Sequence, residues 1–260
     1  MKVEVLVAAV NQDVEQLAEK MNIQTDAVIV NQCDEYGFLE YSHKNRRIRC
    51  FSMAERGVGL NRNTALMRAK EEIILFCDED IVLKDGYEEI ITRAFEANPQ
   101  AHILTFNVVV DPKRRTYYNQ DKHRIRWYNY GRYPAYAIAA RTEALHKAGV
   151  SFSLLFGGGA KYSNGEDSLF LHDCLKKGLR LYTETDEIGE EIYRESTWFH
   201  GYTEKFFKDR GVLYHYLYGK MALVWTLRFL LAKKKIMCKE VSFGQAFAWM
   251  RQGISEGKKI

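Results

Sequence analysis

The sequence predicts an α/β protein in which helices flank a mainly parallel sheet and a helical C-terminal extension follows. Short unbroken apolar runs, typical of strands buried on both faces, alternate with stretches of helical spacing over the first 110 residues. Such alternation predicts a Rossmann-like sheet with right-handed crossovers. The composition, 47% hydrophobic and 28% charged, is ordinary for a globular protein with a substantial core.

Most of the expected strands are short apolar runs, and the expected helices include stretches in which apolar residues recur three or four positions apart. The expected strands are residues 3–10, 27–30, 46–51, 73–77, 101–110, 136–140 and 179–183. The expected helices are residues 13–21, 61–69, 86–97, 143–148 and 168–177. Pro99 ends the third helix, and Gly149 and Gly178 end the last two.

The strand at residues 73–77 runs directly into Asp78, Glu79 and Asp80. Open α/β sheets usually bind ligands at the carboxyl ends of their strands. Asp78 and Asp80 could jointly hold a hard divalent cation, because Mg²⁺ binds carboxylate oxygens together with a substrate's phosphates. The pattern predicts an anchor for a nucleotide diphosphate, and a solvated acidic turn is the alternative.

A second acidic pair, Glu166 and Asp167, follows a glycine-rich loop at residues 157–165 and opens a helix. The dipole and free backbone N–H groups of a helix N-terminus stabilise carboxylates there. Helix capping fully explains one of the two acids, and a functional role is the alternative.

Residues 111–135 interleave basic and aromatic side chains. The basic ones are Lys113, Arg114, Arg115, Lys122, Arg124, Arg126 and Arg132. This pattern suits nucleic acid, sugars or phosphates, and a polar excursion at the sheet edge is the alternative. The net charge of +4 is too small to indicate a nucleic-acid partner, so none is expected.

The carboxyl-terminal run at residues 221–232 is almost entirely apolar, and three lysines follow it. The run is shorter than the roughly 20 residues that span a bilayer. A helix packed on the core is the favoured interpretation. The alternative is peripheral membrane contact through residues 221–235, with the lysines on anionic lipid.

Five scattered cysteines without a Cys-x-x-Cys pair predict reduced thiols, and exclude a disulfide framework or a cysteine-based zinc site. The apolar start at residues 3–10 is strand-sized and broken by Glu4, so no signal peptide is expected. We therefore expect a cytoplasmic protein, peripheral on the inner face of the membrane if residues 221–235 bind lipid.

Taken together, these stretches resemble the GT-A glycosyltransferases, and within them the inverting enzymes of family 2. In that family the first strand ends near an Asn, as at Asn11, and the second ends in an acid that meets the base, as at Asp34. A segment of the type N-x-G-x-x-x-A-R-N follows, here residues 55–63. The D-x-D and E-D motifs correspond to residues 78–80 and 166–167.

Two departures from the family pattern stand out. Asn61 replaces the small residue usual before the Arg-Asn pair, which could alter the fit around the base. The Q-x-x-R-W motif of processive synthases is absent after the E-D helix, where residues 196–205 stand instead. This absence favours a single sugar transfer over polymer synthesis. The resemblance covers residues 1 to about 185.

The resemblance implies a nucleotide diphosphate sugar as donor, with UDP as the expected nucleotide from its frequency in the family, and Mn²⁺ or Mg²⁺ as cofactor. It implies donor contacts from Ala9, Asn11, Asp34, Gly57, Arg62, Asn63 and Asp78. Asp34 and Arg62 would hold the nucleoside. Asp78 would contact the ribose or the metal, and Asp80 would bind the metal directly.

The resemblance also implies the acceptor side. Asp167 would be the general base, while Glu166 and Trp198 would position the acceptor. His200 would bind the metal or the diphosphate, because imidazole suits Mn²⁺ although it matches Mg²⁺ poorly. An ordinary surface or core histidine is the alternative for His200.

The implied organisation is a nucleotide-sugar-binding half at residues 1–110, an acceptor-binding and catalytic half at residues 111–210, and a helical extension at residues 211–260. The implied function is transfer of one sugar, with inversion, to a hydroxyl of a glycan or lipid-linked oligosaccharide in surface polysaccharide or glycoconjugate synthesis.

Two other classes compete with this interpretation. Residues 74–82 also fit the D-x-D-x-[TV] pattern of haloacid-dehalogenase-like phosphatases, with Asp78 as nucleophile. In those enzymes the motif ends the first strand, whereas three expected strands precede it here. A non-catalytic carbohydrate-binding protein would need neither Asp80 nor Asp167.

Overall fold

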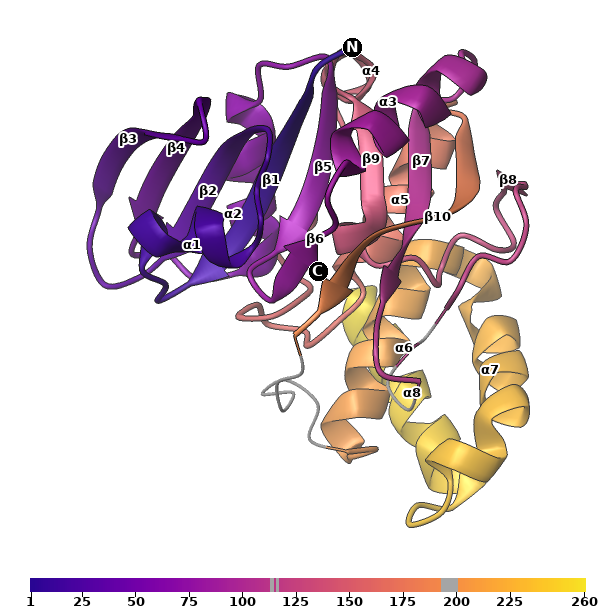
Figure 1. The fold of residues 1–260 in the computed structure, drawn as a ribbon. Coiled ribbons are helices and arrows are strands. Elements are labelled where there is room, and N and C mark those ends of the chain that lie inside the picture. The colour runs from indigo at the N-terminus through magenta and orange to yellow at the C-terminus, as the bar shows by residue number, and fades with distance from the viewer. Residues whose placement is uncertain (113–114, 116, 193–200) are drawn as a thin grey trace.

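The computed structural model describes residues 1–112, 115, 117–192 and 201–260, and it contains a mixed sheet flanked by helices (Figure 1). The strands are β1 (Val3–Val10), β2 (Asp26–Gln32), β3 (Gly37–His43), β4 (Arg46–Met53), β5 (Ile73–Asp78), β6 (Ile81–Leu83), β7 (Ile103–Val109), β8 (Arg124–Ile125), β9 (Ile138–Arg141) and β10 (Leu181–Glu191). The helices are α1 (Val14–Lys20), α2 (Val58–Arg68), α3 (Tyr87–Ala97), α4 (Thr142–Ala148), α5 (Glu166–Lys176), α6 (Glu204–Tyr218), α7 (Ala222–Met237) and α8 (Phe243–Gly257). Short 3₁₀ helices cover Ala135–Ala137 and Gly219–Met221.

The strands lie in the order β3-β4-β2-β1-β5-β9-β7-β10-β6, with β8 paired to β10. Strands β4, β2, β1 and β5 run parallel, as do β7 and β10, whereas β9 lies antiparallel between β5 and β7. This topology confirms the predicted α/β fold with a mainly parallel sheet, and helices α6 to α8 confirm the helical C-terminal region. The division of the chain at residues 110 and 210 stays a prediction.

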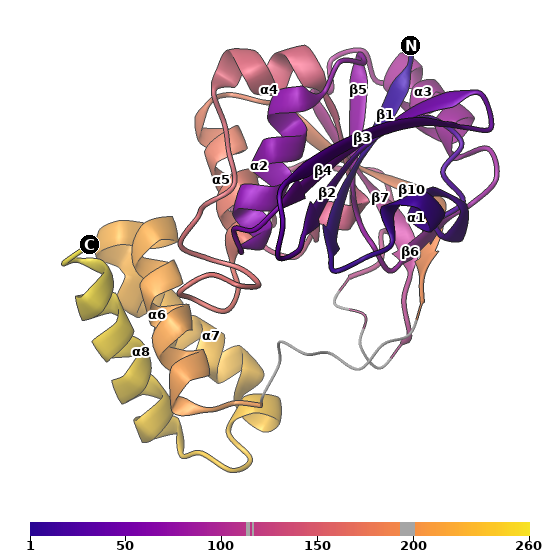
Figure 2. The same ribbon diagram turned by 90° about the vertical axis from the view of Figure 1, so that its left-hand side faces the viewer.

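Alternation along the central strands builds a core on each face of the sheet. In β1, Val5 and Val7 join one buried cluster, while Leu6 joins the other. Helices α1 and α3 cover the first face, and α2, α4 and α5 cover the second (Figure 2). The second cluster continues into α6 and α8, so the helical extension shares a core with the sheet.

The sequence pattern missed β3 and underestimated β10. β3 is an edge strand whose residues are mostly exposed, so it lacks the apolar run expected of a buried strand. β10 extends past Thr183 through a polar, acidic stretch and bends at two register shifts before it pairs with β6. One buried acid in this stretch, Glu184, pairs with Lys122.

Helices α6 and α8 pack closely because glycines lie at their contact. A Cβ atom added at Gly253 would lie 2.0 Å from the carbonyl oxygen of Lys208, and one added at Gly211 would lie 2.1 Å from that of Met250. Helix α7 packs beside them through Ala222, as the favoured interpretation of this run predicted. Among the described residues, every helix is too short or too polar to cross a bilayer.

Candidate active site

The carboxyl ends of β1 and β5 lie side by side and present the first acidic motif. Asp78, the last residue of β5, pairs in register with Ala8 of β1. The Glu79 carboxylate accepts hydrogen bonds from the Val10 backbone N–H at 2.6 Å and from the Gln12 side chain at 3.0 Å. Glu79 therefore ties the two strand ends together. Asp78 and Asp80 are the members of the motif for which ligand binding was predicted.

Arg62 of α2 joins both acidic motifs. Its Nη2 donates to Asp78 Oδ1 at 2.9 Å, and its Nη1 donates to Asp167 Oδ1 at 2.8 Å. The same Nη1 lies 3.5 Å from Glu166 Oε1. We call Arg62, Asp78, Glu166 and Asp167 the acid cluster. Only 5% of the Arg62 side chain is exposed, so its charge is offset by carboxylates instead of water.

Helix α2 can place Arg62 there because it approaches the segment before the glycine-rich loop very closely. A Cβ atom at Gly59 would lie 2.2 Å from the Ser153 carbonyl oxygen, so a larger residue would displace the helix. Asn61, the departure from the family pattern, is buried, and its amide donates to the carbonyl oxygens of Val30 and Ala9. Asn61 thus holds α2 against the ends of β1 and β2.

Asp167 lies in the first turn of α5, where its Oδ2 accepts a hydrogen bond from the Ala135 backbone N–H at 3.1 Å. Burial, followed by the nearby charge of Glu166, raises the pKa of Asp167 to about 7, although Arg62 opposes the shift. Burial alone would lower the pKa of Arg62, but the carboxylates around it raise that pKa overall. A carboxyl group with a pKa near neutrality can accept a proton and release it again at physiological pH.

Two contributors to this site have no sequence signal. Residues 135–137 form a 3₁₀ turn instead of the start of the expected strand at 136–140, and this turn supplies the Ala135 N–H. The neighbouring Tyr136 phenol faces the acids. Burial raises its pKa, and so do the carboxylates of Glu191, Asp78 and Asp167. Nothing in the apolar stretch around them indicates either contact.

Asn63 and Gly57 brace the glycine-rich loop and the segment before it. The Asn63 amide donates to the Phe152 carbonyl at 2.9 Å and accepts from the Phe152 N–H at 2.7 Å. Gly57 caps α2 with a φ of 125°, a region that favours glycine, and the Val58 N–H donates to the Gly158 carbonyl. In the structure, Asn63 and Gly57 support the loop and the segment before it. Their predicted contact with the nucleotide-sugar donor stays a prediction.

Three further predicted donor contacts, Asp34, Ala9 and Asn11, lie at or just beyond the carboxyl ends of β1 and β2. Asp34 follows β2, and its side chain is 96% exposed and accepts a hydrogen bond from Arg56 at 2.6 Å. Ala9 lies in β1 and binds Asn61 through its carbonyl oxygen, while Asn11 follows β1 in a left-handed conformation. Trp198 and His200 lie outside the described residues.

The donor atoms in the first motif fit a hard divalent cation. Carboxylate oxygens of Asp78 and Asp80 are the ligands that Mg²⁺ and Mn²⁺ prefer, and 30% of the Asp78 side chain is exposed. Among the described residues, no group of three or more His, Cys, Asp or Glu side chains is arranged to hold a metal ion. Such a site would need further ligands from a bound diphosphate, as is common for Mg²⁺.

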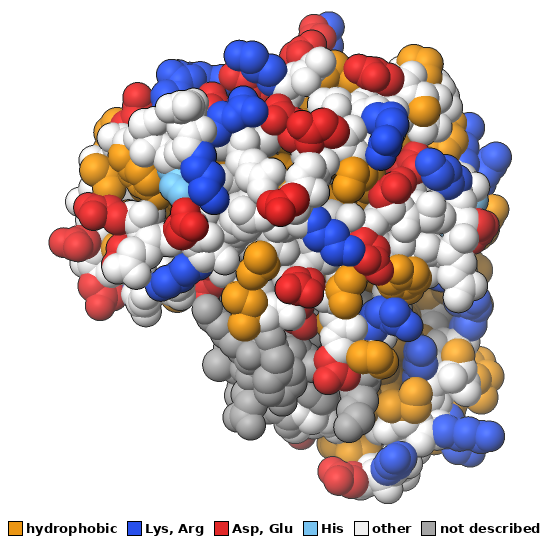
Figure 3. Space-filling view, viewed as in Figure 1, with side chains coloured by type: hydrophobic (Ala, Val, Ile, Leu, Met, Phe, Trp, Pro, Cys, Tyr) orange, Lys and Arg blue, Asp and Glu red, His pale blue; other side chains and the backbone are white. Residues whose placement is uncertain are grey.

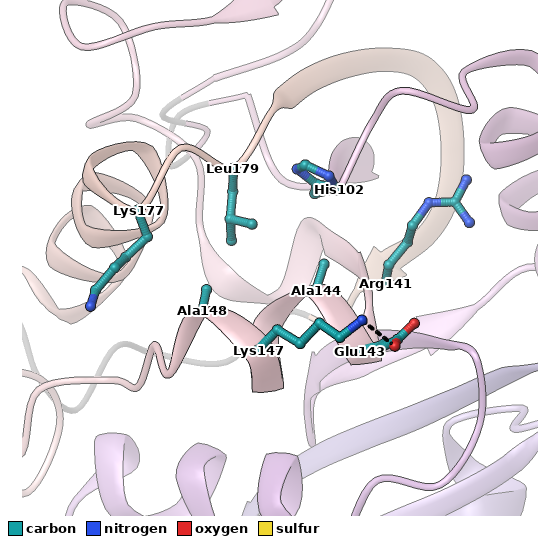
Figure 4. A pocket seen from close by; sticks show the side chains of 8 residues that line it. All are labelled: His102, Arg141, Glu143, Ala144, Lys147, Ala148, Lys177 and Leu179. Atoms are coloured by element: carbon teal, nitrogen blue, oxygen red, sulfur yellow. Dashed lines mark ion pairs between the residues drawn. The ribbon is translucent and has the colours of Figure 1, made fainter.

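A surface cavity of about 460 Å³ lies at the opposite edge of the sheet. Figure 4 shows its lining residues, which are His102, Arg141, Glu143, Ala144, Lys147, Ala148, Lys177 and Leu179. Arg141 pairs with Ile73 at the start of β5, and Asp78 lies five positions further along this strand, at a distance of roughly 17 Å from Ile73. Lys147 is already paired with Glu143 at 2.6 Å. We therefore place the chemistry at the acid cluster.

Comparison with known proteins identifies the family and the fold of the chain. A sequence model described as glycosyl transferase family 2 matches residues 10–156 of the chain. Among curated protein sequences, none matches the chain.

Two solved structures show a similar fold. TarS (residues 1–349) of S. aureus in complex with UDP-GlcNAc is 15% identical, with a TM-score of 0.62 over 92% of this chain and 74% of that chain. The mannosyltransferase PcManGT from Pyrobaculum calidifontis, in complex with GDP-Man and Mn²⁺, is 15% identical, with a TM-score of 0.52 over 99% of this chain and 87% of that chain. At this identity the two likenesses show the fold, which is GT-A, while the sequence match covers more than half of the chain. The chain therefore belongs to glycosyl transferase family 2.

Proposed function

We propose that this glycosyltransferase moves a single sugar from a nucleotide diphosphate sugar to an acceptor hydroxyl, with inversion at the anomeric carbon. The observation that carries the proposal is the contact of Arg62 with both Asp78 and Asp167. The single side chain of Arg62 bridges Asp78, at the end of β5, and Asp167, whose pKa is about 7. This juxtaposition suits a reaction in which a leaving group departs on one side and a proton is removed on the other.

In the proposed reaction Asp167 removes the proton from the acceptor hydroxyl while that oxygen attacks the anomeric carbon. The new C–O bond forms as the bond from this carbon to the diphosphate breaks, and the nucleoside diphosphate leaves with the electron pair. Arg62 and the Ala135 N–H hold the Asp167 carboxylate in place. Glu166, beside it at the start of α5, would position the acceptor.

Asp78 and Asp80 would hold a divalent cation together with the donor diphosphate. When bound, Mn²⁺ or Mg²⁺ would offset the negative charge that develops on the leaving group. TarS binds UDP-GlcNAc and PcManGT binds GDP-Man with Mn²⁺. These complexes support a nucleotide sugar as donor here, and UDP is the nucleotide we propose.

We propose a glycan or lipid-linked oligosaccharide as acceptor, in surface polysaccharide or glycoconjugate synthesis at the cytoplasmic side of the membrane. A second cavity, of about 450 Å³, supports an acceptor site beside the glycine-rich loop. It lies between Lys161 of the loop and Lys205 and Asp209 of α6. The Asp209 carboxylate, which lines this cavity, accepts hydrogen bonds from the backbone N–H and the hydroxyl of Ser163. Asp209 thereby links the wall of the cavity to the turn that precedes Glu166.

Thermal-shift titration with UDP, GDP, CDP, dTDP and ADP, with and without Mn²⁺, tests the donor side. A ligand that binds only the folded protein raises its apparent stability by mass action. We expect one diphosphate, UDP, to raise the melting temperature in a Mn²⁺-dependent way. If none of the five does so at high concentration, the proposed function is wrong.

Asp80→Asn should remove the Mn²⁺ dependence of that shift, because the change deletes a carboxylate ligand of the proposed metal. We expect nucleotide affinity in the presence of Mn²⁺ to fall at least about tenfold, because loss of even an outer-shell partner of a metal ligand costs about 10–100-fold. Asp85→Asn, which replaces an exposed acid beyond β6, is the matched control. An unchanged Mn²⁺ effect in Asp80→Asn would remove Asp80 from the metal site.

The rate of transfer should depend on the ionisation of Asp167. Below its pKa of about 7 the carboxyl group is protonated and cannot accept the acceptor's proton. The logarithm of kcat/KM should therefore rise with pH at a slope of one and level off near pH 7. A flat profile between pH 5 and pH 8, in a range where the protein stays folded, would contradict the role of Asp167 as base.

A further inference from the structure

Helix α7 exposes an apolar stripe that its packing leaves uncovered. Its buried positions, Ala222, Thr226 and Leu230, follow one another four residues apart and face the other helices. Leu223, Leu227 and Leu231 follow with the same spacing along a different side of the helix. Their side chains are 44%, 45% and 61% exposed, and the neighbouring Val224 is 57% exposed. We call Leu223, Val224, Leu227 and Leu231 the α7 stripe.

Basic side chains surround the α7 stripe. Lys220 precedes the helix, Arg228 lies within it, and residues 233–235 at its far end are all lysine. The chain carries no Asp or Glu from residue 211 to residue 239. Orange and blue side chains lie together over α7 at the lower right of Figure 3. Among the described residues, none of the ion pairs involves these cations.

We propose that this face of α7 binds the surface of an anionic lipid bilayer, with the α7 stripe in the interface and the cations on lipid phosphates. A helix with an apolar side and lysines beside it lies in the plane of a membrane interface and gains from both burial and charge. Residues 222–237 are too few to span the bilayer, so the helix lies on the membrane instead of crossing it.

A bilayer explains this face better than a second copy of the chain. A two-fold dimer would place the same patch of both copies together and bring the basic residues of one α7 helix toward the basic residues of the other. Like charges so placed would repel one another across the contact. An anionic membrane complements both the apolar and the basic parts of the face.

The proposal also connects the membrane to the acid cluster. Helix α6 contacts α7 through Tyr214 against Phe229 and through Tyr218 stacked on Trp225, with ring centroids 5.7 and 4.7 Å apart. The same helix holds Ser163 of the glycine-rich loop through Asp209. Among the described elements, only α6 would therefore separate a bilayer on α7 from the glycine-rich loop that precedes Glu166 and Asp167. This arrangement suits the lipid-linked acceptor of the proposed function.

Co-sedimentation of the full chain with vesicles tests the proposal directly, and it does not depend on the proposed sugar transfer. We expect binding to vesicles that contain phosphatidylglycerol, weaker binding at high salt, and little binding to pure phosphatidylcholine. Leu227→Ser with Leu231→Ser should weaken binding by at least about tenfold, because two apolar contacts are lost. Lys234→Glu with Lys235→Glu should have an effect of similar size.

Two matched controls keep the test specific. Met67→Ser changes an apolar side chain that is 70% exposed on α2. Lys176→Glu with Lys177→Glu reverses an exposed lysine pair at the end of α5. Both should bind vesicles like the wild type, and melting curves of all variants should match the wild type.

Three results would overturn the proposal. The first is no sedimentation of the wild-type chain with anionic vesicles at high lipid concentration. The second is equal binding by the α7 variants and the controls. The third is a concentration-dependent dimer in analytical ultracentrifugation that Leu227→Ser with Leu231→Ser converts to monomer, without vesicle binding by the wild type. That last result would assign the face to self-association.

Discussion

Asp167→Asn should abolish most of the sugar transfer and leave nucleotide binding intact. Asparagine has nearly the same shape but cannot accept the acceptor's proton, and removal of a general base costs about 10²–10⁴-fold in rate. The amide can keep only one of the two hydrogen bonds that the carboxylate accepts, from Arg62 and from the Ala135 N–H. Release of nucleoside diphosphate from the donor sugar in the presence of acceptor measures the loss in kcat.

Two further measurements separate loss of the base from loss of structure. The UDP-induced thermal shift should be unchanged in Asp167→Asn, since the donor side of the site is intact, and any residual rate should no longer rise toward pH 7. Asp173→Asn makes the same change two turns along α5, on a half-exposed acid, and should keep full activity. If Asp167→Asn transfers sugar at a near-normal rate, Asp167 is not the general base and another group has that role.

The part of this site that could be predicted from the sequence is the part that depends on residues close together along the chain. Asp78 follows an apolar run, and Glu166 and Asp167 follow a glycine-rich loop, so local pattern alone brings them to strand and helix ends. The fold then follows, because a parallel sheet gathers such ends at one edge. The family resemblance added the roles of these residues, which stay predictions.

The rest of the site depends on contacts between residues distant in sequence. Arg62 and Asp167 are 105 positions apart, so no spacing rule reveals that the arginine binds the acids. We predicted a nucleoside contact for Arg62, whereas its hydrogen-bond and ion-pair partners in the described structure are carboxylates. The Ala135 N–H depends on a 3₁₀ turn within a segment whose apolar residues predict a strand. Backbone donors of this kind carry no side-chain signature.

The same limit explains the errors in the fold. β3 is an exposed edge strand, and the second half of β10 is rich in acids, so neither carries the burial pattern on which strand prediction depends. β10 is held by its neighbours β7 and β6 despite its composition. Helix α7 has a buried side and an exposed apolar side, and a mostly apolar sequence cannot distinguish a wholly packed helix from one with an uncovered face.

Arg62→Met should destabilise the protein more than any other single change at the site. The substitution keeps most of the side-chain volume but leaves Asp78, Glu166 and Asp167 facing one another without a cation. Removal of one partner from a buried ionic group costs about 3–5 kcal/mol in the free energy of unfolding. Chemical denaturation at pH 8 measures this loss. Arg68→Met, on the same helix, loses a cation–π contact with Phe51 and a hydrogen bond to the Thr64 carbonyl, and should cost about 2 kcal/mol or less.

The pH dependence of this loss separates an electrostatic role of Arg62 from simple packing. Arg62 lowers the pKa of Asp167, so the variant should raise that pKa above about 7. Asp167 is an acid whose pKa is higher in the folded protein than in the unfolded chain. Asp167 therefore keeps its proton to a higher pH in the folded protein than in the unfolded chain. The free energy of unfolding falls as the pH rises from the pKa of Asp167 in the unfolded chain to its pKa in the folded protein. The deficit of Arg62→Met should be smaller at pH 5 than at pH 8, and the rising limb of kcat/KM should move to higher pH.

Arg62→Lys provides the complementary test, because it keeps the charge but not the fork that reaches two carboxylates at once. We expect it to recover part of the lost stability and to return the kcat/KM limb toward pH 7, while kcat stays low because Asp167 is less firmly held. If Arg62→Met and Arg62→Lys show equal stability deficits that do not change between pH 5 and pH 8, Arg62 acts through packing alone. The proposal that it couples the donor and acceptor sides of the site would then be wrong.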